Sequence, residues 1–218
     1  MDSEVYGKIK ALADHYALQL DSQIRARLLE MQGDDNSHYL IYRALGIPDK
    51  AGGRIDMYQN VGRFLYKYAG SFLESSAMIC IQHAYPDAQK VRIPNTLGNQ
   101  PKTFEIDCLV HSSTGTRAHE IKWRDATTDG DHISKEATRV NVIRNHGYIP
   151  IRIMFYYPQR EQAQKIQMGL AELYRSIGGE YYGGESAWNY MKEFTGIDLR
   201  EILEQIAEAR SVYYADQR

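Results

Sequence analysis

The chain has 218 residues, 43% of them hydrophobic, and a formal net charge of −2 from 26 basic and 28 acidic residues. This length suits one compact domain, or one core with an appended subdomain. The charge balance excludes a protein that holds nucleic acid by bulk positive charge, so any basic surface must be local. The polar N-terminus predicts no signal peptide, no apolar run approaches the roughly 20 residues of a membrane span, and Cys80 and Cys108 are expected as free thiols in a reducing cytoplasm.

The first third of the chain is expected to be helical. Apolar residues recur at three- and four-residue steps over 3–32, which predicts an amphipathic helix. A short helix is expected over 38–45. Residues 49–53, which include two consecutive glycines, are predicted to form a loop, and a second long helix follows over 54–83.

A β-hairpin is the central feature of the sequence. A short strand is predicted at 90–94, and two further strands are predicted at 104–110 and 118–123. The segment between these two strands is rich in Ser, Thr and Gly, which is typical of a turn longer than two residues.

Beyond the hairpin, helices alternate with one more strand. The strongest strand signal in the chain is a β-branched run that ends near Pro158. The expected elements are a loop over 125–132, a helix over 133–145, a strand over 149–157, and helices over 159–177, 185–194 and 198–214. This order predicts an α/β fold with a mixed central β-sheet flanked by helices, and with helical additions at both termini.

Strand geometry sorts the residues of the hairpin onto two faces. Side chains at i and i+2 share one side of a strand. The apolar face of the first strand is expected to consist of Phe104, Ile106, Cys108 and Val110, whereas Glu105, Asp107 and Leu109 face the other way. On the second strand, Glu120, Lys122 and Arg124 point away from Ile121 and Trp123. We therefore expect Asp107, Glu120 and Lys122 to converge at the edge of the sheet.

Two carboxylates and an ammonium group at one place have a recognisable chemistry. Paired carboxylates suit a hard cation such as Mg²⁺, with water and substrate phosphate at its other positions. The metal polarises a phosphoryl oxygen and activates a bound water, and a neighbouring lysine can orient that water or stabilise developing negative charge. A cross-strand salt bridge on a solvated sheet face explains the same three residues without any catalysis.

The order of elements, with Asp107 on one strand and Glu120-Ile121-Lys122 on the next, resembles the PD-(D/E)xK nuclease superfamily over roughly residues 70–157. That superfamily has a core of helix, three-stranded meander, helix and strand, and Ile106 stands where many members have proline. Within it, the size of the chain and the run from Glu120 to His132 resemble a Type II restriction endonuclease, and the ApaLI-like group is the nearest.

The resemblance implies a role for each residue of the candidate site. Asp107 and Glu120 would bind Mg²⁺, and Lys122 would position the attacking water. Glu74 occupies the place of a glutamate on the first core helix that reaches the metal in many members, although an ordinary helix charge explains it equally well. The implied organisation is a single nuclease domain over 1–218, with a helical segment at 1–53, the nuclease core at 54–157 and a second helical segment at 158–218.

The loop that follows the candidate site would face DNA. Arg can read guanine, Asp can accept a hydrogen bond from cytosine, and Thr can touch a thymine methyl group or a phosphate. Turn chemistry and an N-cap at Asp131 explain the same loop, and a solvated helix face explains the basic residues Lys135, Arg139 and Arg144 equally well. The candidates for DNA contact are Arg124, Asp125, Thr127, Thr128 and Lys135.

The expected function is a cytoplasmic Mg²⁺-dependent endonuclease that cuts double-stranded DNA at a specific sequence. A homodimer is expected because palindromic sites demand two-fold protein symmetry. Two alternatives remain open: a repair or junction-resolving nuclease of the same fold, which would read DNA shape, and a DNA-binding module without catalysis. A zinc site is not expected, because the spacings of His111, His119, His132 and His146 match no closed zinc site.

Overall fold

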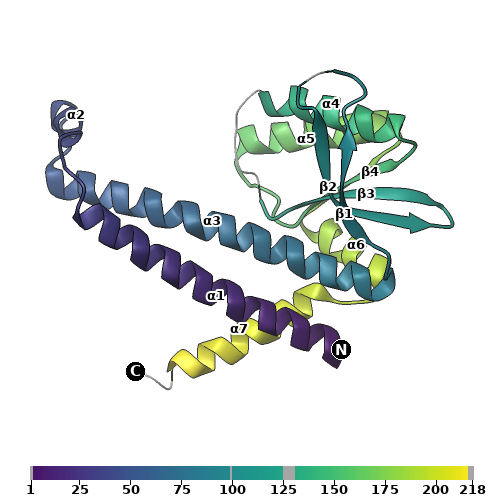
Figure 1. Cartoon of the computed structure of the whole chain (residues 1–218), viewed down its shortest axis with the longest axis horizontal. Helices are drawn as coiled ribbons and strands as arrows, with labels where there is room; N and C mark the ends of the chain where they lie inside the picture. The colour runs from purple at the N-terminus through teal and green to yellow at the C-terminus, as the bar shows by residue number, and fades with distance from the viewer. Residues whose placement is uncertain (1, 99, 125–130, 216–218) are drawn as a thin grey trace. The chain divides into compact units, whose positions relative to one another are not determined.

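A computed structural model of the chain describes residues 2–98, 100–124 and 131–215 (Figure 1). The chain packs as two compact units, one made of Met1–Lys10 with Leu73–Arg218 and the other of Ala11–Phe72. Two long helices each run from one unit into the other. The single nuclease domain expected from the sequence stays a prediction.

The unit Ala11–Phe72 is a helical hairpin. Its elements belong to α1 (Ser3–Gln32), α2 (Tyr39–Ala44) and α3 (Asp49–Ala84). The ring of Tyr16 on α1 lies edge-on to the ring of Tyr68 on α3, with a centroid distance of 6.1 Å. At the turn of the hairpin, Tyr42 on α2 donates a hydrogen bond of 2.8 Å to Asp56 on α3. The two long helices therefore lie side by side within this unit (Figure 1).

The predicted loop at 49–53 is wrong, because these residues form the first turns of α3. Gly52 packs directly under the ring of Tyr42, and a Cβ atom at this position would lie 2.7 Å from Cδ2 of that ring. The glycine is therefore present for close packing between α2 and α3. Two consecutive glycines predict the end of a helix only where they are not required for close packing against a neighbouring side chain.

The larger unit contains one five-stranded sheet with strand order β1-β2-β3-β4-β5. β1, β2 and β3 form an antiparallel meander, whereas β3, β4 and β5 are parallel. This arrangement confirms the predicted α/β fold with a mixed central sheet. The strands are β1 (Gln89–Pro94), β2 (Thr103–Ser112), β3 (Gly115–Lys122), β4 (Ile149–Met154) and β5 (Glu180–Gly183).

Helices flank the sheet, as expected. They are the C-terminal part of α3 together with α4 (Asp131–Asn145), α5 (Glu161–Ser176), α6 (Glu185–Thr195) and α7 (Leu199–Ala215). Among the described residues, no helix combines the length and the apolar character needed to cross a bilayer. The short strand β5 was not predicted from the sequence, because glycines border it and the strand with which it pairs, β4, is distant in the chain.

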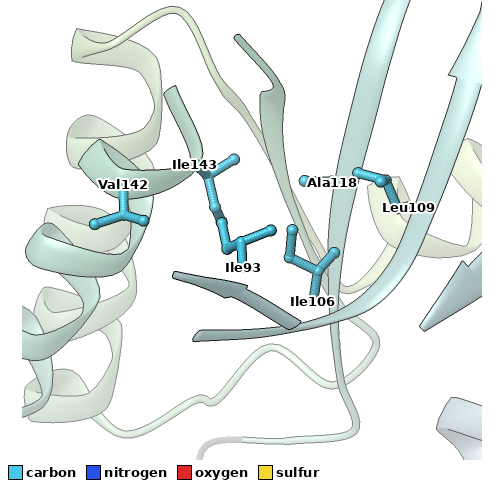
Figure 2. Packing of buried hydrophobic residues seen from close by; sticks show 6 residues of the cluster. All are labelled: Ile93, Ile106, Leu109, Ala118, Val142 and Ile143. Atoms are coloured by element: carbon cyan, nitrogen blue, oxygen red, sulfur yellow. The ribbon is translucent and has the colours of Figure 1, made fainter. Parts of the chain in front are cut away.

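The apolar core on one face of the sheet shows that β2 does not alternate strictly. Ile106 and Leu109 both belong to the cluster that packs against α4, and Figure 2 shows Ile143 of α4 directed at Ile93 and Ile106. Residues three apart share a face here because the β1–β2 register shifts between Gln89 and Val91. The strict alternation predicted for β2, with Ile106 and Leu109 on opposite faces, is therefore wrong. The extra residue of β2 in this β-bulge falls at Asp107–Cys108.

Candidate active site

Asp107 lies where β2 and β3 separate. The paired register of the two strands runs from Ser112 and Gly115 at the turn to Cys108 and His119, one residue short of Asp107. Beyond that point the Asp107 side chain replaces the backbone hydrogen bonds between the strands. Its Oδ2 atom accepts a hydrogen bond of 2.9 Å from the backbone N–H of Ile121. The bulge in β2 therefore directs a carboxylate toward the neighbouring strand.

Lys122 connects the two carboxylates of the candidate site. Its Nζ atom lies 2.5 Å from Oε1 of Glu120 and 3.6 Å from Oδ2 of Asp107. The Asp107 and Glu120 residues are buried, with 6% and 3% of their surface exposed, whereas 38% of the Lys122 side chain is exposed. The structure thus brings together the three residues that the sequence placed on one polar face. Their catalytic roles stay predictions.

Burial and neighbouring charges push the pKa values of the two carboxyl groups apart. Burial, followed by the negative charge of Glu120, raises the pKa of Asp107 to about 6, although Lys122 opposes the shift. Burial also acts to raise the pKa of Glu120, but the positive charges of Arg139 and Lys122 outweigh it and lower this pKa to about 2. Glu120 is therefore ionised throughout the physiological range, whereas Asp107 takes up a proton as the pH falls below about 6.

Lys122 stays protonated in this site. Burial alone would lower the pKa of its ammonium group, but the charges of Glu120 and Asp107 outweigh burial and raise it. Because its pKa is raised, Lys122 is protonated at neutral pH and cannot act as a base. It acts instead as a hydrogen-bond donor and a positive charge.

A buried network behind Glu120 was missed in the sequence. Arg139 on α4 donates hydrogen bonds to the Glu120 carboxylate and, at 2.6 Å, to the backbone carbonyl of Glu105. Only 13% of the Arg139 side chain is exposed, so the solvated helix face considered for it is wrong. Glu136, one turn away, accepts hydrogen bonds of 3.1 Å from Arg152 and 2.5 Å from the Tyr174 hydroxyl. The sequence signal for this network is Arg152, a charged residue within the otherwise apolar strand β4.

Glu74 lies close to the site but is held by another residue. Its Oε1 atom lies 2.6 Å from Nζ of Lys90 on β1, and the same ammonium group contacts Glu105 at 3.0 Å. The Glu74 charge is among the causes that raise the pKa of Asp107. Glu74 thus acts on Asp107 electrostatically, and its role as a metal ligand stays a prediction.

The candidates for DNA contact are only partly covered by the structure. Asp125, Thr127 and Thr128 lie outside the described residues. The guanidinium group of Arg124 lies over the ring of Tyr156, 5.4 Å from its centroid, and 5.7 Å from that of Trp123. Lys135 is exposed on α4.

His119 points to the opposite face of the sheet from Glu120, as predicted. It contacts the Tyr190 hydroxyl on α6 at 2.8 Å and the carbonyl of Cys108 at 3.2 Å, and burial lowers its pKa to about 4. Within residues 2–98, 100–124 and 131–215, no three His, Cys, Asp or Glu side chains are grouped so that they could hold a metal ion.

The donor set of Asp107 and Glu120 nevertheless fits Mg²⁺. This ion is commonly held by one or two carboxylates, with water and substrate phosphate at its remaining positions. Two buried carboxylates at the point where two strands separate supply that number of protein ligands. Burial and then the negative charge of Glu120 raise the pKa of Asp107, and a bound cation would favour its ionised form. The arrangement suits hydrolysis of a phosphodiester, with Lys122 as a charge beside the reacting phosphate.

Comparison with known protein families agrees with this geometry. The family model of the ApaLI-like restriction endonucleases matches residues 1–208. The match includes the whole of the unit Ala11–Phe72, most of the larger unit and every residue of the candidate site. No curated protein matches the chain at a significant level.

Proposed function

Because the chain belongs to the ApaLI-like restriction endonuclease family, we propose that it is a Type II enzyme that cuts double-stranded DNA at a specific sequence by Mg²⁺-dependent phosphodiester hydrolysis. The family makes the chain a nuclease of restriction systems that binds DNA. The observation that supports the finer proposal is the contact of Lys122 with two buried carboxylates on adjacent strands. We place its action in the cytoplasm, on incoming DNA.

Asp107 and Glu120 are the proposed metal-binding residues, in the manner of the PD-(D/E)xK nucleases. When bound, Mg²⁺ would polarise a phosphoryl oxygen and make a bound water more nucleophilic. Glu120 is suited to this role because Arg139 and Lys122 keep it ionised. Glu74 is proposed as a further acidic group that tunes the affinity of the site for the ion.

Lys122 is proposed to act through its positive charge. Its ammonium group is already oriented by Glu120 and Asp107, and its raised pKa keeps it protonated. It can therefore donate hydrogen bonds to the attacking water and to a non-bridging phosphate oxygen, where negative charge increases in the transition state. The expected product carries a 5′-phosphate, as in the superfamily that the site resembles.

Sequence recognition is proposed to involve the segment that follows β3. Arg124 would read a base or contact the backbone, Asp125, Thr127 and Thr128 would contact base edges, and Lys135 would hold a phosphate. A double-strand cut at a palindromic site requires two active sites related by a two-fold axis, so we propose that the enzyme is a homodimer.

Digestion of unmethylated phage DNA with 10-fold graded enzyme concentrations in Mg²⁺ tests this proposal. Discrete fragments, lost in EDTA and absent with a Lys122→Met variant, are expected. Run-off sequencing of the fragment ends would then give the recognition sequence. A smear would contradict sequence specificity, cleavage of branched DNA alone would indicate a junction-resolving nuclease, and retention of DNA without cutting would indicate a binding module.

A further inference from the structure

Arg139 holds one oxygen of the Glu120 carboxylate. Its Nη2 group donates hydrogen bonds to Oε2 of Glu120 and, at 2.6 Å, to the backbone carbonyl of Glu105 on the neighbouring strand. The other oxygen, Oε1, lies 2.5 Å from Nζ of Lys122. The two oxygens of Glu120 therefore face two different cations, one on α4 and one at the end of β3.

Arg139 and Lys122 differ in how firmly they are held. The Arg139 side chain is 13% exposed, and its Nη1 atom lies 4.0 Å from Oε2 of Glu136, which is itself fixed by two further hydrogen bonds. The Lys122 side chain is 38% exposed, so its ammonium group has room to move aside for an incoming ion. Oε1 is thus the oxygen that Glu120 can offer to a ligand, whereas Oε2 stays with Arg139.

Asp107 is limited in the same way. Its Oδ2 atom accepts the backbone N–H of Ile121 at 2.9 Å, so this oxygen is committed to the fold. The Asp107 side chain is only 8% exposed, which leaves it little freedom to turn. Each carboxylate of the candidate site is therefore bound to the protein through one oxygen and presents the other.

Stability alone does not explain a guanidinium group at this place. Among the described residues, the buried Nε atoms of Arg139 and Arg152 have no hydrogen-bond partner, and a buried donor without a partner costs stability. A buried ion pair is also often no more stabilising than apolar residues of similar volume. What Arg139 supplies, and an apolar residue does not, is a fixed orientation of Glu120, because the planar guanidinium group binds its acceptors in a rigid geometry.

The number of oxygens that a carboxylate offers discriminates between divalent ions. Mg²⁺ demands a near-ideal octahedron of about six ligands and usually keeps several waters beside one or two carboxylates. Ca²⁺ takes about six to eight oxygens at longer distances, in a flexible geometry that accepts both oxygens of one carboxylate. A site in which each of two carboxylates offers a single oxygen suits Mg²⁺ and leaves Ca²⁺ short of protein ligands.

We propose that Arg139 is a positioning residue that restricts Glu120 to binding a metal ion through one oxygen, and that this restriction selects Mg²⁺ over Ca²⁺. The inference rests on the proposed function, since it takes Asp107 and Glu120 as the metal-binding residues. It goes beyond that function because it assigns ion selectivity to a residue outside the metal-binding and DNA-contacting sets. Metal binding by the DNA-free protein tests it without any cleavage.

Displacement of Mn²⁺ is the first test. Electron paramagnetic resonance measures free Mn²⁺ in a solution of the full chain, and titration with Mg²⁺ or Ca²⁺ gives a dissociation constant for each ion. Arg139→Lys keeps the positive charge but loses the planar group that holds Oε2, so Glu120 is free to turn and offer both oxygens. The dissociation constant for Ca²⁺ divided by that for Mg²⁺ is expected to fall at least about 10-fold. Arg144→Lys, on the exposed side of α4, is the control and should leave this ratio unchanged.

Infrared difference spectra of the wild-type protein are the second test and need no substitution in the network. The antisymmetric and symmetric stretching bands of a carboxylate are further apart when it binds an ion through one oxygen than when it binds through both. With a stoichiometric amount of metal, the wild type should show the wide separation with Ca²⁺ as well as with Mg²⁺. Arg139→Lys should show the narrow separation with Ca²⁺.

A folded Arg139→Lys variant that binds both ions more weakly, but with an unchanged ratio, would mean that Arg139 has only a structural role and would overturn the inference. If the variant does not fold, the wild-type spectra decide, because the narrow separation with Ca²⁺ overturns the inference and the wide one supports it. Absence of metal binding by the wild type would instead contradict the proposed metal site, and with it the proposed function.

Discussion

The Asp107 carboxylate accepts the backbone N–H of Ile121 at 2.9 Å, although the pairing of their two strands ends one residue earlier. One side chain thus satisfies a donor on the neighbouring strand and contributes a charge to the candidate site. The hydrogen bond favours the ionised carboxylate, whereas burial opposes ionisation more strongly. The proposed metal-binding role, which needs the ionised carboxylate, and the stability of the fold therefore make opposite demands on Asp107.

Replacing Asp107 with asparagine is expected to stabilise the protein at neutral pH. Burial raises the pKa of Asp107 from its ordinary value of 3.8 to about 6, so its contribution to stability is fully present below about pH 4 and is lost as the pH rises through 6. Asparagine keeps an oxygen for Ile121 but does not ionise. Urea unfolding of Asp107→Asn should show a gain of up to about 3 kcal/mol at pH 7.5 that disappears near pH 4.

Asp198 provides the control for that measurement. The hydrogen bond that its carboxylate accepts from Lys192 lowers the pKa of Asp198, so its contribution to stability has the opposite sign and is lost as the pH falls. An Asp198→Asn variant should be less stable than the wild type at pH 7.5. A loss of stability in both variants at that pH would mean that Asp107 is stabilised as an anion.

Lys122→Met is expected to lower cleavage by about 10²–10³-fold or more, because a positioned positive charge at the reacting phosphate is removed. Part of the Lys122 side chain is exposed, so the methionine should be tolerated and the unfolding temperature should change little. Single-turnover cleavage measures the effect. Lys165→Met, at an exposed i,i+4 pair with Glu161, is the matched control. Wild-type cleavage rates in Lys122→Met would remove Lys122 from the mechanism.

Glu74→Gln should change the Mg²⁺ dependence of cleavage, whereas Glu105→Gln should not. Each substitution removes one carboxylate partner of Lys90, so the two variants perturb the same ion pair. Only Glu74 is among the charges that act on Asp107. A loss of metal affinity of about 10–100-fold is expected for Glu74→Gln, as for groups that support metal ligands. Identical Mg²⁺ titrations for the two variants would make Glu74 an ordinary helix charge.

Arg139→Met should destabilise the fold strongly. The substitution removes the arginine that is hydrogen-bonded to Glu120 and also a partner of Glu136, in a place from which water is excluded. Breaking one side of a buried ion pair typically costs about 3–5 kcal/mol. Urea unfolding measures the loss, and Arg144→Met, on the exposed side of the same helix, is the control. Equal stability of the two variants would contradict a structural role for Arg139.

The part of the site that could be predicted from the sequence is the part that is local in the chain. Asp107, Glu120 and Lys122 lie on one hairpin, so the alternation of side chains was enough to place them together. Arg139, Arg152 and Tyr174 reach the network around Glu120 and Glu136 from three other elements. Only packing of α4 and α5 on the sheet brings them together, and no spacing in the sequence records that packing.

The errors in the fold have a similar origin. Gly52 was interpreted as a break because its packing partner Tyr42 comes from a different helix. The strand β5 was missed because its hydrogen-bonding partners lie in β4, with α5 in between. Local propensity decides the type of a long, periodic element, whereas contacts between distant residues decide short elements.

The bulge in β2 makes the length of this segment as important as its composition. Between Ile106 and Leu109 the strand has one residue more than its partner β1, and both of these side chains lie in the same core cluster. Deleting that one residue would restore regular pairing with β1. It would also reverse the faces of the side chains on one side of the deletion, which would remove either a core contact of Ile106 or Leu109 or the Asp107 carboxylate from the site. Relatives that keep this chemistry should therefore vary freely in side chains along β2 but conserve the number of residues from Ile106 to Leu109. Insertions and deletions should accumulate instead in the turn between β2 and β3.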